Sequence, residues 1–256
     1  LLYIIRYGIA YVRMEREVDG KIESTDQKHI MRYQQLFASL AIRKKLAEGI
    51  KSGVVWHTQG SGKTALSYYL TYILNDFYSK QNKAAKFYFF VDRLDLLEQA
   101  TQEFEARGLV VSTANTRTEL MEQFRSNQAQ QGTSGQAEIT VVNIQRFAED
   151  KEKVRINDYA TNLQRIFILD EAHHSPANTY QKVMNYFEPQ LFLGMTATPD
   201  KRDDHIEGRN VYELFHHQIA HEIRLQKAME EHLLCPFHYF GITDLEVIAD
   251  AGKSSE

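Results

Sequence analysis

One stretch decides the fold expected of this chain: Trp56-His57-Thr58-Gln59-Gly60-Ser61-Gly62-Lys63-Thr64. An apolar run at 54–56 leads into it, and a helix-forming run at 65–78 follows it. A strand, a glycine-rich turn ending in Gly-Lys-Thr and a helix, in this order, are typical of the loop that holds the phosphates of a nucleoside triphosphate. The alternative is a flexible turn before a solvated helix, and the position between strand and helix disfavours it.

The residue types in this stretch fit that chemistry. Gly60 and Gly62 allow a tight turn whose backbone N–H groups, with the positive end of the following helix, face phosphate oxygens. Lys63 is expected to contact the β- and γ-phosphates as a catalytic residue, and the Thr64 hydroxyl is expected to bind Mg²⁺. His57 stands where the usual pattern has glycine or alanine, so the loop needs support elsewhere in the chain. The predicted ATP-binding loop also includes Thr58, Gln59 and Ser61.

A carboxylate pair gives that support. The apolar run at 165–169 continues directly into Asp170-Glu171-Ala172-His173. Two carboxylates at the end of a buried strand are unfavourable without a cation, and a Mg²⁺ ion beside Asp170 would offset that cost. Glu171 is then placed to accept a proton from the water that attacks the γ-phosphate. A helix cap is the alternative for such a pair, and the phosphate loop upstream disfavours it.

A third polar turn follows the apolar run at 191–195. It reads Thr196-Ala197-Thr198-Pro199. Small hydroxyl residues at the end of a strand can link the carboxylates of the nucleotide site to a DNA-facing surface. The residues predicted to couple the two are His173, Thr196, Ala197 and Thr198.

Polar side chains also follow two other apolar runs. Arg93 comes after one of them, and Asn143 and Gln145 come after the next. Open α/β sheets bind ligands at the carboxyl ends of their strands, so these three residues are candidate contacts to DNA phosphates. The alternatives are an ion pair from Arg93 to Asp95 or Glu98 and a helix cap formed by Asn143.

Arg32 and Gln35 lie near the start of a helix that apolar spacing predicts over His29–Glu48. An amide can both donate and accept a hydrogen bond at the edge of adenine. Gln35, with Arg32 three residues before it, is therefore predicted to bind the base of ATP. An ordinary polar helix face is the alternative.

The composition narrows the class of protein. The 256 residues carry a net charge of −4, so any DNA contact is expected on one face of the molecule. The single cysteine, Cys235, excludes an internal disulfide and a multi-cysteine zinc site. No apolar run reaches the length of a transmembrane helix, and residues 1–7, expected to form a strand, lack the basic leader of a signal peptide. A cytoplasmic protein without membrane contact is expected.

The spacing of buried strands and helices predicts a doubly wound, mainly parallel α/β sheet with helices on both faces. Residues 1–28 are expected to be a linker or the remnant of an upstream domain, with a hairpin at Met14–Ser24. Residues 29–240 are expected to form the ATP-binding domain, including a helix at Glu222–Leu233. Residues 241–256 are expected to begin a connection to a further domain.

Three motifs together resemble those of superfamily 2 helicases and translocases. They are Gly-Ser-Gly-Lys-Thr, Asp-Glu-Ala-His and Thr-Ala-Thr, which occur in this order at three strand ends within residues 32–240. A closer resemblance is to the motor subunit of type I restriction enzymes, in which a histidine at position 57 is the expected residue. That resemblance is carried by residues 11–35, 56–64, 91–96 and 142–147, whereas 174–180 and 234–241 are more similar to stand-alone DEAH-type DNA helicases.

The resemblance implies a RecA-like P-loop NTPase domain that uses ATP and Mg²⁺ to move along double-stranded DNA. In such motors a second RecA-like domain of the same parent chain supplies arginine fingers, worth about 10³–10⁵ in rate, so this chain alone is expected to hydrolyse ATP weakly. In type I enzymes the partners include specificity and methylation subunits, and the parent is a site-specific deoxyribonuclease. The alternatives are a stand-alone DEAH-type DNA helicase, an RNA helicase and a non-hydrolysing scaffold module.

Overall fold

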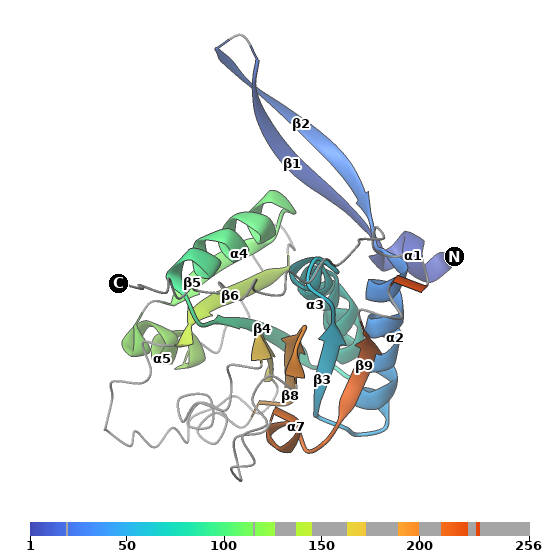
Figure 1. Ribbon diagram of the computed structural model, residues 1–256. Helices are drawn as coiled ribbons and strands as arrows, with labels where there is room; N and C mark the ends of the chain where they lie inside the picture. The colour runs from blue at the N-terminus through green and yellow to red at the C-terminus, as the bar shows by residue number, and fades with distance from the viewer. Residues whose placement is uncertain are drawn as a thin grey trace, which may run out of the picture. The chain divides into compact units, whose positions relative to one another are not determined.

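In the described part of the chain, seven parallel strands form the central sheet of the computed structural model, in the order β5-β6-β4-β7-β8-β3-β9 (Figure 1). Every pair of neighbours in this sheet is parallel. The parallel α/β sheet expected from the sequence is thereby confirmed. The strands are β3 (Ser52–His57), β4 (Ala84–Val91), β5 (Val110–Ala114), β6 (Glu138–Asn143), β7 (Leu163–Leu169), β8 (Leu191–Thr196) and β9 (Ile219–Ile223).

Contacts divide the chain into two compact units, Leu1–Arg224 and Leu225–Glu256. Of the second unit, the structure describes residues 229 and 230, and all the helices and strands named here belong to the first. The described residues are 1–18, 20–114, 116–125, 137–144, 163–172, 189–199, 211–224 and 229–230.

Both faces of the sheet are buried. Successive side chains of a strand point to opposite faces, and on β4 both sets of side chains lie in apolar clusters. On β4, Phe87 and Phe89 join an apolar cluster with residues of three helices, whereas Tyr88 and Phe90 join a second cluster that includes residues of α5 and α7. Helices therefore cover both faces, as expected. The helices of the first cluster are α2 (Tyr33–Ala47), α3 (Lys63–Ser79) and α4 (Leu94–Ala106), and those of the second are α5 (Arg117–Arg125) and α7 (Val211–Leu214).

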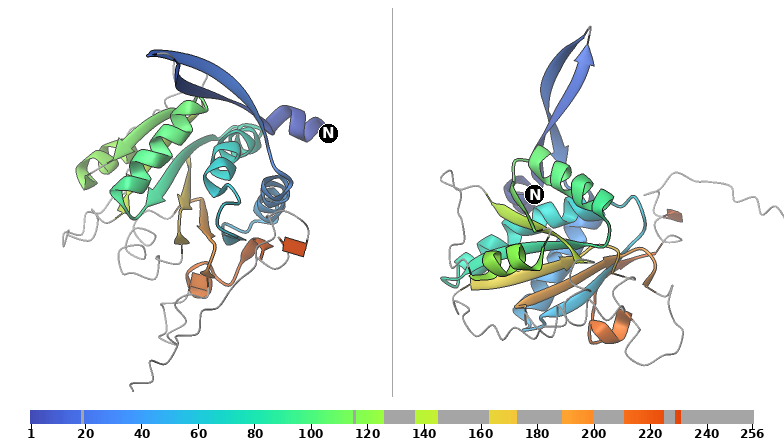
Figure 2. Two further views of the ribbon diagram at one scale, coloured as in Figure 1. Left: turned by 45° about the horizontal axis from the view of Figure 1, so that its top comes forward. Right: turned by 90° about the vertical axis from the view of Figure 1, so that its left-hand side faces the viewer.

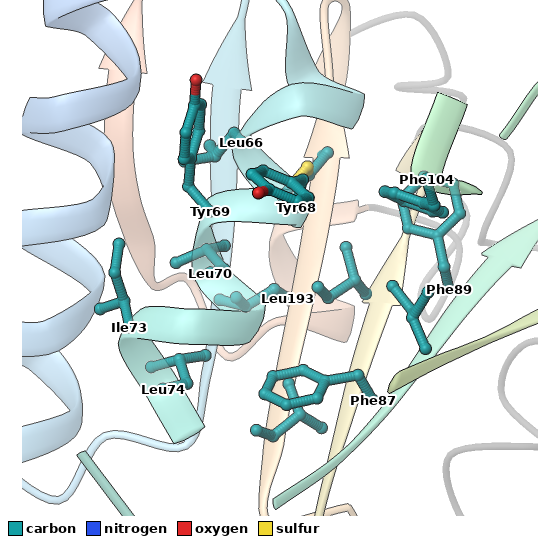
Figure 3. Packing of buried hydrophobic residues seen from close by; sticks show 14 of the residues in the cluster. Leu66, Tyr68, Tyr69, Leu70, Ile73, Leu74, Phe87, Phe89, Phe104 and Leu193 are labelled. Carbon is teal, nitrogen blue, oxygen red and sulfur yellow. The ribbon is translucent and has the colours of Figure 1, made fainter. Parts of the chain in front are cut away.

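Helix α3 is held on the sheet by an apolar face. Leu66, Leu70 and Leu74 recur every fourth residue and are fully buried, and they belong with Leu193 of β8 and Phe87 of β4 to the apolar cluster that Figure 3 shows. This spacing is typical of the core-facing side of a helix. Because α3 begins directly after the phosphate loop, this packing also fixes the position of the loop.

Gly194 of β8 lies against Phe215, which follows α7, and against Ala172. A Cβ atom at Gly194 would lie 2.8 Å from Cε2 of Phe215 and 2.9 Å from Cβ of Ala172. The Phe215 ring is also stacked on Phe192, with ring centroids 4.6 Å apart. Only glycine therefore fits here without a shift of the ring or of Ala172, which follows Glu171.

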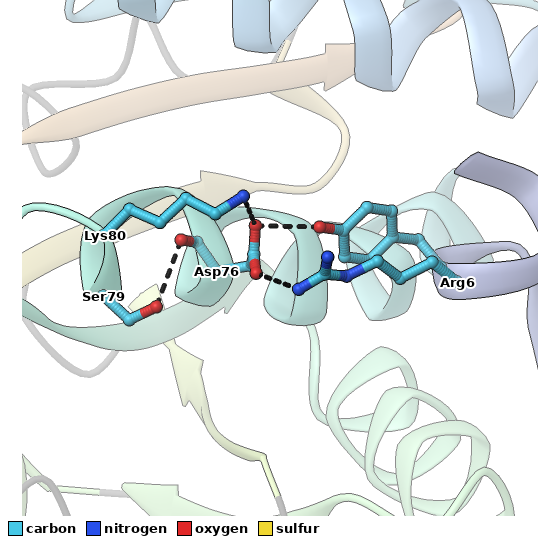
Figure 4. A network of polar contacts seen from close by, with 5 residues as sticks. Arg6, Asp76, Ser79 and Lys80 are labelled. Carbon is cyan, nitrogen blue, oxygen red and sulfur yellow. Dashed lines mark hydrogen bonds and ion pairs between the residues drawn. The ribbon is translucent and has the colours of Figure 1, made fainter. Parts of the chain in front are cut away.

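The N-terminal segment differs from its prediction. Residues 2–7 form helix α1 (Leu2–Tyr7) rather than a strand. Arg6 Nη2 and Tyr7 Oη contact the Asp76 carboxylate of α3 at 2.5 and 2.8 Å, and Lys80 Nζ lies 2.7 Å from the same carboxylate (Figure 4). These polar contacts fasten α1 to α3, and such long-range pairs are invisible to a local apolar pattern.

The expected hairpin exists and is longer than predicted. Strands β1 (Ile9–Val18) and β2 (Lys21–Ile30) pair antiparallel along their whole length, from Ile9 with Ile30 to Val18 with Lys21. The two strands extend away from the parallel sheet as a separate ribbon (Figures 1 and 2). The pairing carries the chain in extended form past residue 29, so α2 begins at Tyr33 and the predicted start at His29 is wrong.

Strand β9 was not expected. The predicted helix at Glu222–Leu233 is wrong at its start, because Glu222 and Ile223 belong to β9, which pairs parallel with β3. Polar residues interrupt this short edge strand, so it shows no continuous apolar run. The rest of that predicted helix, apart from residues 224, 229 and 230, lies outside the described residues. No helix in the described part of the chain has the length and apolar character needed to cross a membrane.

Candidate nucleotide-binding site

The phosphate loop lies between β3 and α3, as the sequence predicts. Gly60 and Gly62 adopt φ values of 76° and 79°, in the left-handed region that favours glycine. Gly62 is the N-cap residue of α3 and provides no side-chain cap. The first N–H groups of a helix have no partner within it, so they remain available to an anion.

The side chains of the loop fit a triphosphate. The Ser61 hydroxyl is buried, with the residue 4% exposed, and has no hydrogen-bond partner among the described residues. Lys63 is 9% exposed, and its Nζ lies 3.7 Å from Oε1 of Glu171. A buried ammonium, a buried hydroxyl and the first N–H groups of α3, which have no partner within the helix, form a set of donors that phosphate oxygens would satisfy.

The carboxylate pair lies at the carboxyl end of β7. The backbone N–H of Asp170 donates to the carbonyl of Phe90 on β4 at 3.0 Å, which fixes the turn that follows the strand. Burial, and after it the Glu171 carboxylate, raises the pKa of Asp170 to about 6, while Lys63 acts to lower it. Glu171 has a φ of 49°, a conformation that few residues other than glycine adopt. Strained backbone of this kind is common at functional sites.

The residues present also fit Mg²⁺. The partly buried Asp170 carboxylate, next to a second acid, would be stabilised by a cation. Thr64 lies in the first turn of α3, directly after Lys63. Among the described residues there is no group of three or more His, Cys, Asp or Glu that could hold a metal ion by itself. A Mg²⁺ ion here would therefore depend on phosphate oxygens and water for its remaining ligands.

Arg32 and Gln35 contact the loop itself, which was not predicted. Gln35 Nε2 donates to the Gly62 carbonyl at 3.0 Å, and its Oε1 accepts from the Arg32 N–H at 2.9 Å. Arg32 Nη1 donates to the Gly60 carbonyl at 3.4 Å. An amide has two N–H groups and two lone pairs on oxygen, so these two contacts use one N–H and one lone pair of Gln35. The adenine contact predicted for Gln35 stays a prediction. A Cβ at Gly62 would lie 2.5 Å from Gln35 Nε2, so the contact between Gln35 and Gly62 also requires glycine.

Trp56 and His57 join the loop to two other segments. Trp56 Nε1 donates to the carbonyl of Ala197 at 3.1 Å, which connects β3 to the Thr-Ala-Thr turn. His57 is fully buried, and its Nε2 lies 2.8 Å from Nδ1 of His221 on β9. Burial, followed by His221 and Lys63, lowers the pKa of His57 to about 3, so the ring is neutral at pH 7. Sequence reasoning singled out His57 but gave no sign of His221.

The predicted coupling residues are described in part. Thr196 is fully buried at the end of β8, and its Oγ1 accepts from the Thr198 N–H at 3.2 Å. Thr198 itself is exposed. Ala197 contacts Trp56 as given above. His173 lies outside the described residues.

The predicted DNA contacts differ in exposure. Arg93 follows β4 and Asn143 ends β6, and these strands are neighbours in the sheet. Arg93 is 61% exposed, and its Nε lies 3.9 Å from Asp92 and 3.8 Å from Asp95. Asn143 is 3% exposed, so its side chain is not open to a DNA strand as that of Arg93 is. Gln145 lies outside the described residues.

Comparison with solved structures supports the fold. The nuclease-deletion mutant of the Type ISP restriction-modification enzyme LlaGI, in complex with a DNA substrate mimic, aligns with a TM-score of 0.54 and 15% identity over 80% of this chain and 20% of that one. The Type ISP enzyme LlaBIII bound to DNA aligns with the same TM-score and 14% identity, over 85% of this chain and 17% of that one. At this identity the likeness is one of fold. It agrees with the RecA-like P-loop NTPase fold expected from the sequence.

Curated relatives are more similar in sequence. The type I restriction enzyme SauCOLORF180P endonuclease subunit of Staphylococcus aureus (strain COL) is 32% identical over 191 residues. The HindI endonuclease subunit of Haemophilus influenzae is 28% identical over 259 residues, which cover 93% of this chain. This chain spans about a fifth of each relative, 19% and 23% respectively.

A family comparison covers most of the chain. The family described as "Type III restriction enzyme, res subunit" (ResIII) matches residues 28–201. The matched segment includes the phosphate loop, the carboxylate pair and the Thr-Ala-Thr turn. The superfamily 2 helicase motifs noted in the sequence therefore lie on the part of the chain that defines the family. This chain belongs to the ResIII family of helicase-type domains.

Proposed function

We propose that this chain is the ATP-binding half of an ATP-dependent DNA translocase, and that its parent protein is the endonuclease subunit of a type I restriction enzyme. The observation that carries the proposal is the contact between Lys63 of the phosphate loop and Glu171 of the carboxylate pair, 3.7 Å apart. It joins the two halves of an ATP-hydrolysis site from segments more than one hundred residues apart in the sequence. The relatives named as type I endonuclease subunits support the choice of parent.

The geometry suggests how the residues act. Lys63 and Glu171 neutralise one another while no phosphate is bound. When a γ-phosphate arrives, the Lys63 ammonium transfers its contact to the phosphate oxygens, because a phosphate group carries more charge than a carboxylate. Glu171 is then released to accept a proton from the attacking water. A Mg²⁺ ion bound by Asp170 and Thr64 would neutralise charge on the β- and γ-phosphates.

The remaining parts of the motor are also proposals. Arg93 binds the DNA backbone from the carboxyl edge of the sheet. Asn143, at the end of β6, and Gln145, two residues further along the sequence, are the other proposed contacts at this edge. A second RecA-like domain of the parent chain closes the ATP site and supplies arginine fingers to the domain formed by residues 29–240. The specificity and methylation subunits of a type I complex are the expected partners.

The choice of nucleic acid is tested by ATP hydrolysis in the full-length protein. Double-stranded DNA is expected to stimulate hydrolysis, and duplex RNA of equal length to have little effect, when the salt concentration is held constant. Arg93→Gln is expected to raise the DNA concentration needed for half-maximal stimulation by about three- to tenfold, since it removes one phosphate contact. The rate without DNA should not change.

Lys83→Gln is the matched control, because Lys83 is exposed and precedes β4, at the end opposite to Arg93. It should leave the DNA dependence unaltered. Stronger stimulation by RNA than by DNA would contradict the proposed translocase on DNA. Equal effects of the two substitutions would remove Arg93 from the DNA-binding surface.

A further inference from the structure

Strand β9 and the residue directly after it, Arg224, contact two consecutive residues at the start of the phosphate loop. The first is Trp56, whose ring lies under the guanidinium of Arg224, with Arg224 Cζ 4.4 Å from the ring centroid. The second is His57, whose Nε2 lies 2.8 Å from Nδ1 of His221. The backbones are paired here as well, Trp56 with Glu222 and His57 with Ile223.

The histidine contact is more than packing. A buried ring could be replaced by an apolar side chain if its task were only to fill space. In His57 one ring nitrogen instead meets His221, while the other, Nδ1, has no partner among the described residues. In a hydrogen bond between two imidazole nitrogens, one nitrogen must donate and the other accept. The contact with His221 therefore restricts the tautomer and the ring orientation of His57.

The His57–His221 contact lies directly before the first turn of the phosphate loop, so it influences the position of that turn. His57 ends β3, and the next residue, Thr58, accepts the N–H of Ser61 at 3.2 Å through its carbonyl, which closes the first turn of the loop. A rotation of His57 would shift that turn and the donors that follow it. Trp56, held by Arg224 on one side, also donates to Ala197 of the Thr-Ala-Thr turn.

We propose that His221 is a positioning residue for ATP binding: through its hydrogen bond to His57 it holds the start of the phosphate loop in the arrangement that receives the triphosphate. Arg224 assists by holding the Trp56 ring. The inference rests on the proposed function, because it takes ATP to be the ligand of the loop. It adds a residue of β9, outside the matched segment 28–201, to the machinery of the site.

The test is steady-state ATP hydrolysis by variants of the full-length protein. His221→Ala is expected to raise KM for ATP about tenfold, the size expected when a buried polar atom loses its partner, while kcat changes by less than about twofold. His221→Asn keeps a polar atom near the position of Nδ1 and is expected to restore KM. His217→Asn is the control, because His217 is exposed and its φ of 56° suits asparagine.

A double substitution separates this role from a general effect on folding. His57→Gln combined with His221→Ala should raise KM no further than the larger of the two single changes, because both remove the same contact. Thermal unfolding of all variants should stay within a few degrees of the wild type. An unchanged KM in His221→Ala would overturn the inference alone, as would equal losses in His221→Ala and His221→Asn. A wild-type protein that binds no ATP would overturn both the inference and the proposed function.

Discussion

Glu171→Gln is expected to lower kcat for ATP hydrolysis by about 10²–10⁴-fold, the contribution typical of a general base. ATP binding should be retained or strengthened. In the structure Lys63 Nζ lies 3.7 Å from the Glu171 carboxylate, so loss of that charge removes a competitor of the γ-phosphate for Lys63. The measurement is hydrolysis with saturating DNA, together with equilibrium binding of ATP, in the full-length protein.

Glu105→Gln is the control for this substitution, because Glu105 is an exposed acid on α4. Its kcat should equal that of the wild type. If Glu171→Gln hydrolysed ATP normally, Glu171 would not be the base, and a scaffold that binds nucleotide without hydrolysing it would become the better description. Loss of binding together with hydrolysis would show that Glu171 mainly supports the fold of the loop.

Gly194→Ala is expected to destabilise the protein and also to lower its ATPase activity. The added methyl group would lie 2.8 Å from Cε2 of Phe215 and 2.9 Å from Cβ of Ala172. Overpacking of this kind costs about 1–3 kcal/mol, and for a chain of this size each kcal/mol lowers the melting temperature by about 2–4 °C. Activity should fall as well, because a displaced Ala172 moves the adjacent Glu171. Thermal unfolding and ATP hydrolysis measure the two effects.

A double variant assigns the cause of the destabilisation. Phe215→Leu removes the ring edge that the new methyl group would meet, although it also loses the stacking on Phe192. Gly194→Ala with Phe215→Leu should therefore be more stable than the sum of the two single changes predicts. Strict additivity would mean that the ring is not the obstacle at Gly194.

Much of the fold follows from local sequence. The apolar runs that became β4, β6, β7 and β8 are buried on both faces, and such strands are recognisable without any knowledge of their neighbours. Their carboxyl ends bear the polar residues, and a parallel sheet brings those ends to one edge. The Lys63–Glu171 contact therefore joins two residues that the sequence alone selects, Lys63 as the predicted phosphate contact and Glu171 as the predicted general base.

Other features depend on contacts distant in sequence. His57 and His221 are 164 residues apart, and the strand that holds His221 has no continuous apolar run. Gln35 reaches Gly62 across 27 residues, so its contact with the loop was missed although Gln35 itself was chosen. Helix α1 is six residues long and has no buried side chain. A helix this short shows no helical spacing of apolar residues, so its apolar sequence was predicted to form a strand. Local patterns do not specify such pairings.

The proposed function depends most directly on ATP binding at the phosphate loop. Equilibrium binding of ATP in the presence of Mg²⁺ should be measured for the full-length wild type, Lys63→Ala and the control Lys83→Ala. The wild type and Lys83→Ala are expected to bind ATP saturably with equal affinity. Lys63→Ala should bind about 10–100-fold more weakly, because a charged hydrogen bond to phosphate contributes about 1.5–3 kcal/mol. Equal affinity of Lys63→Ala and the wild type would contradict the proposed function.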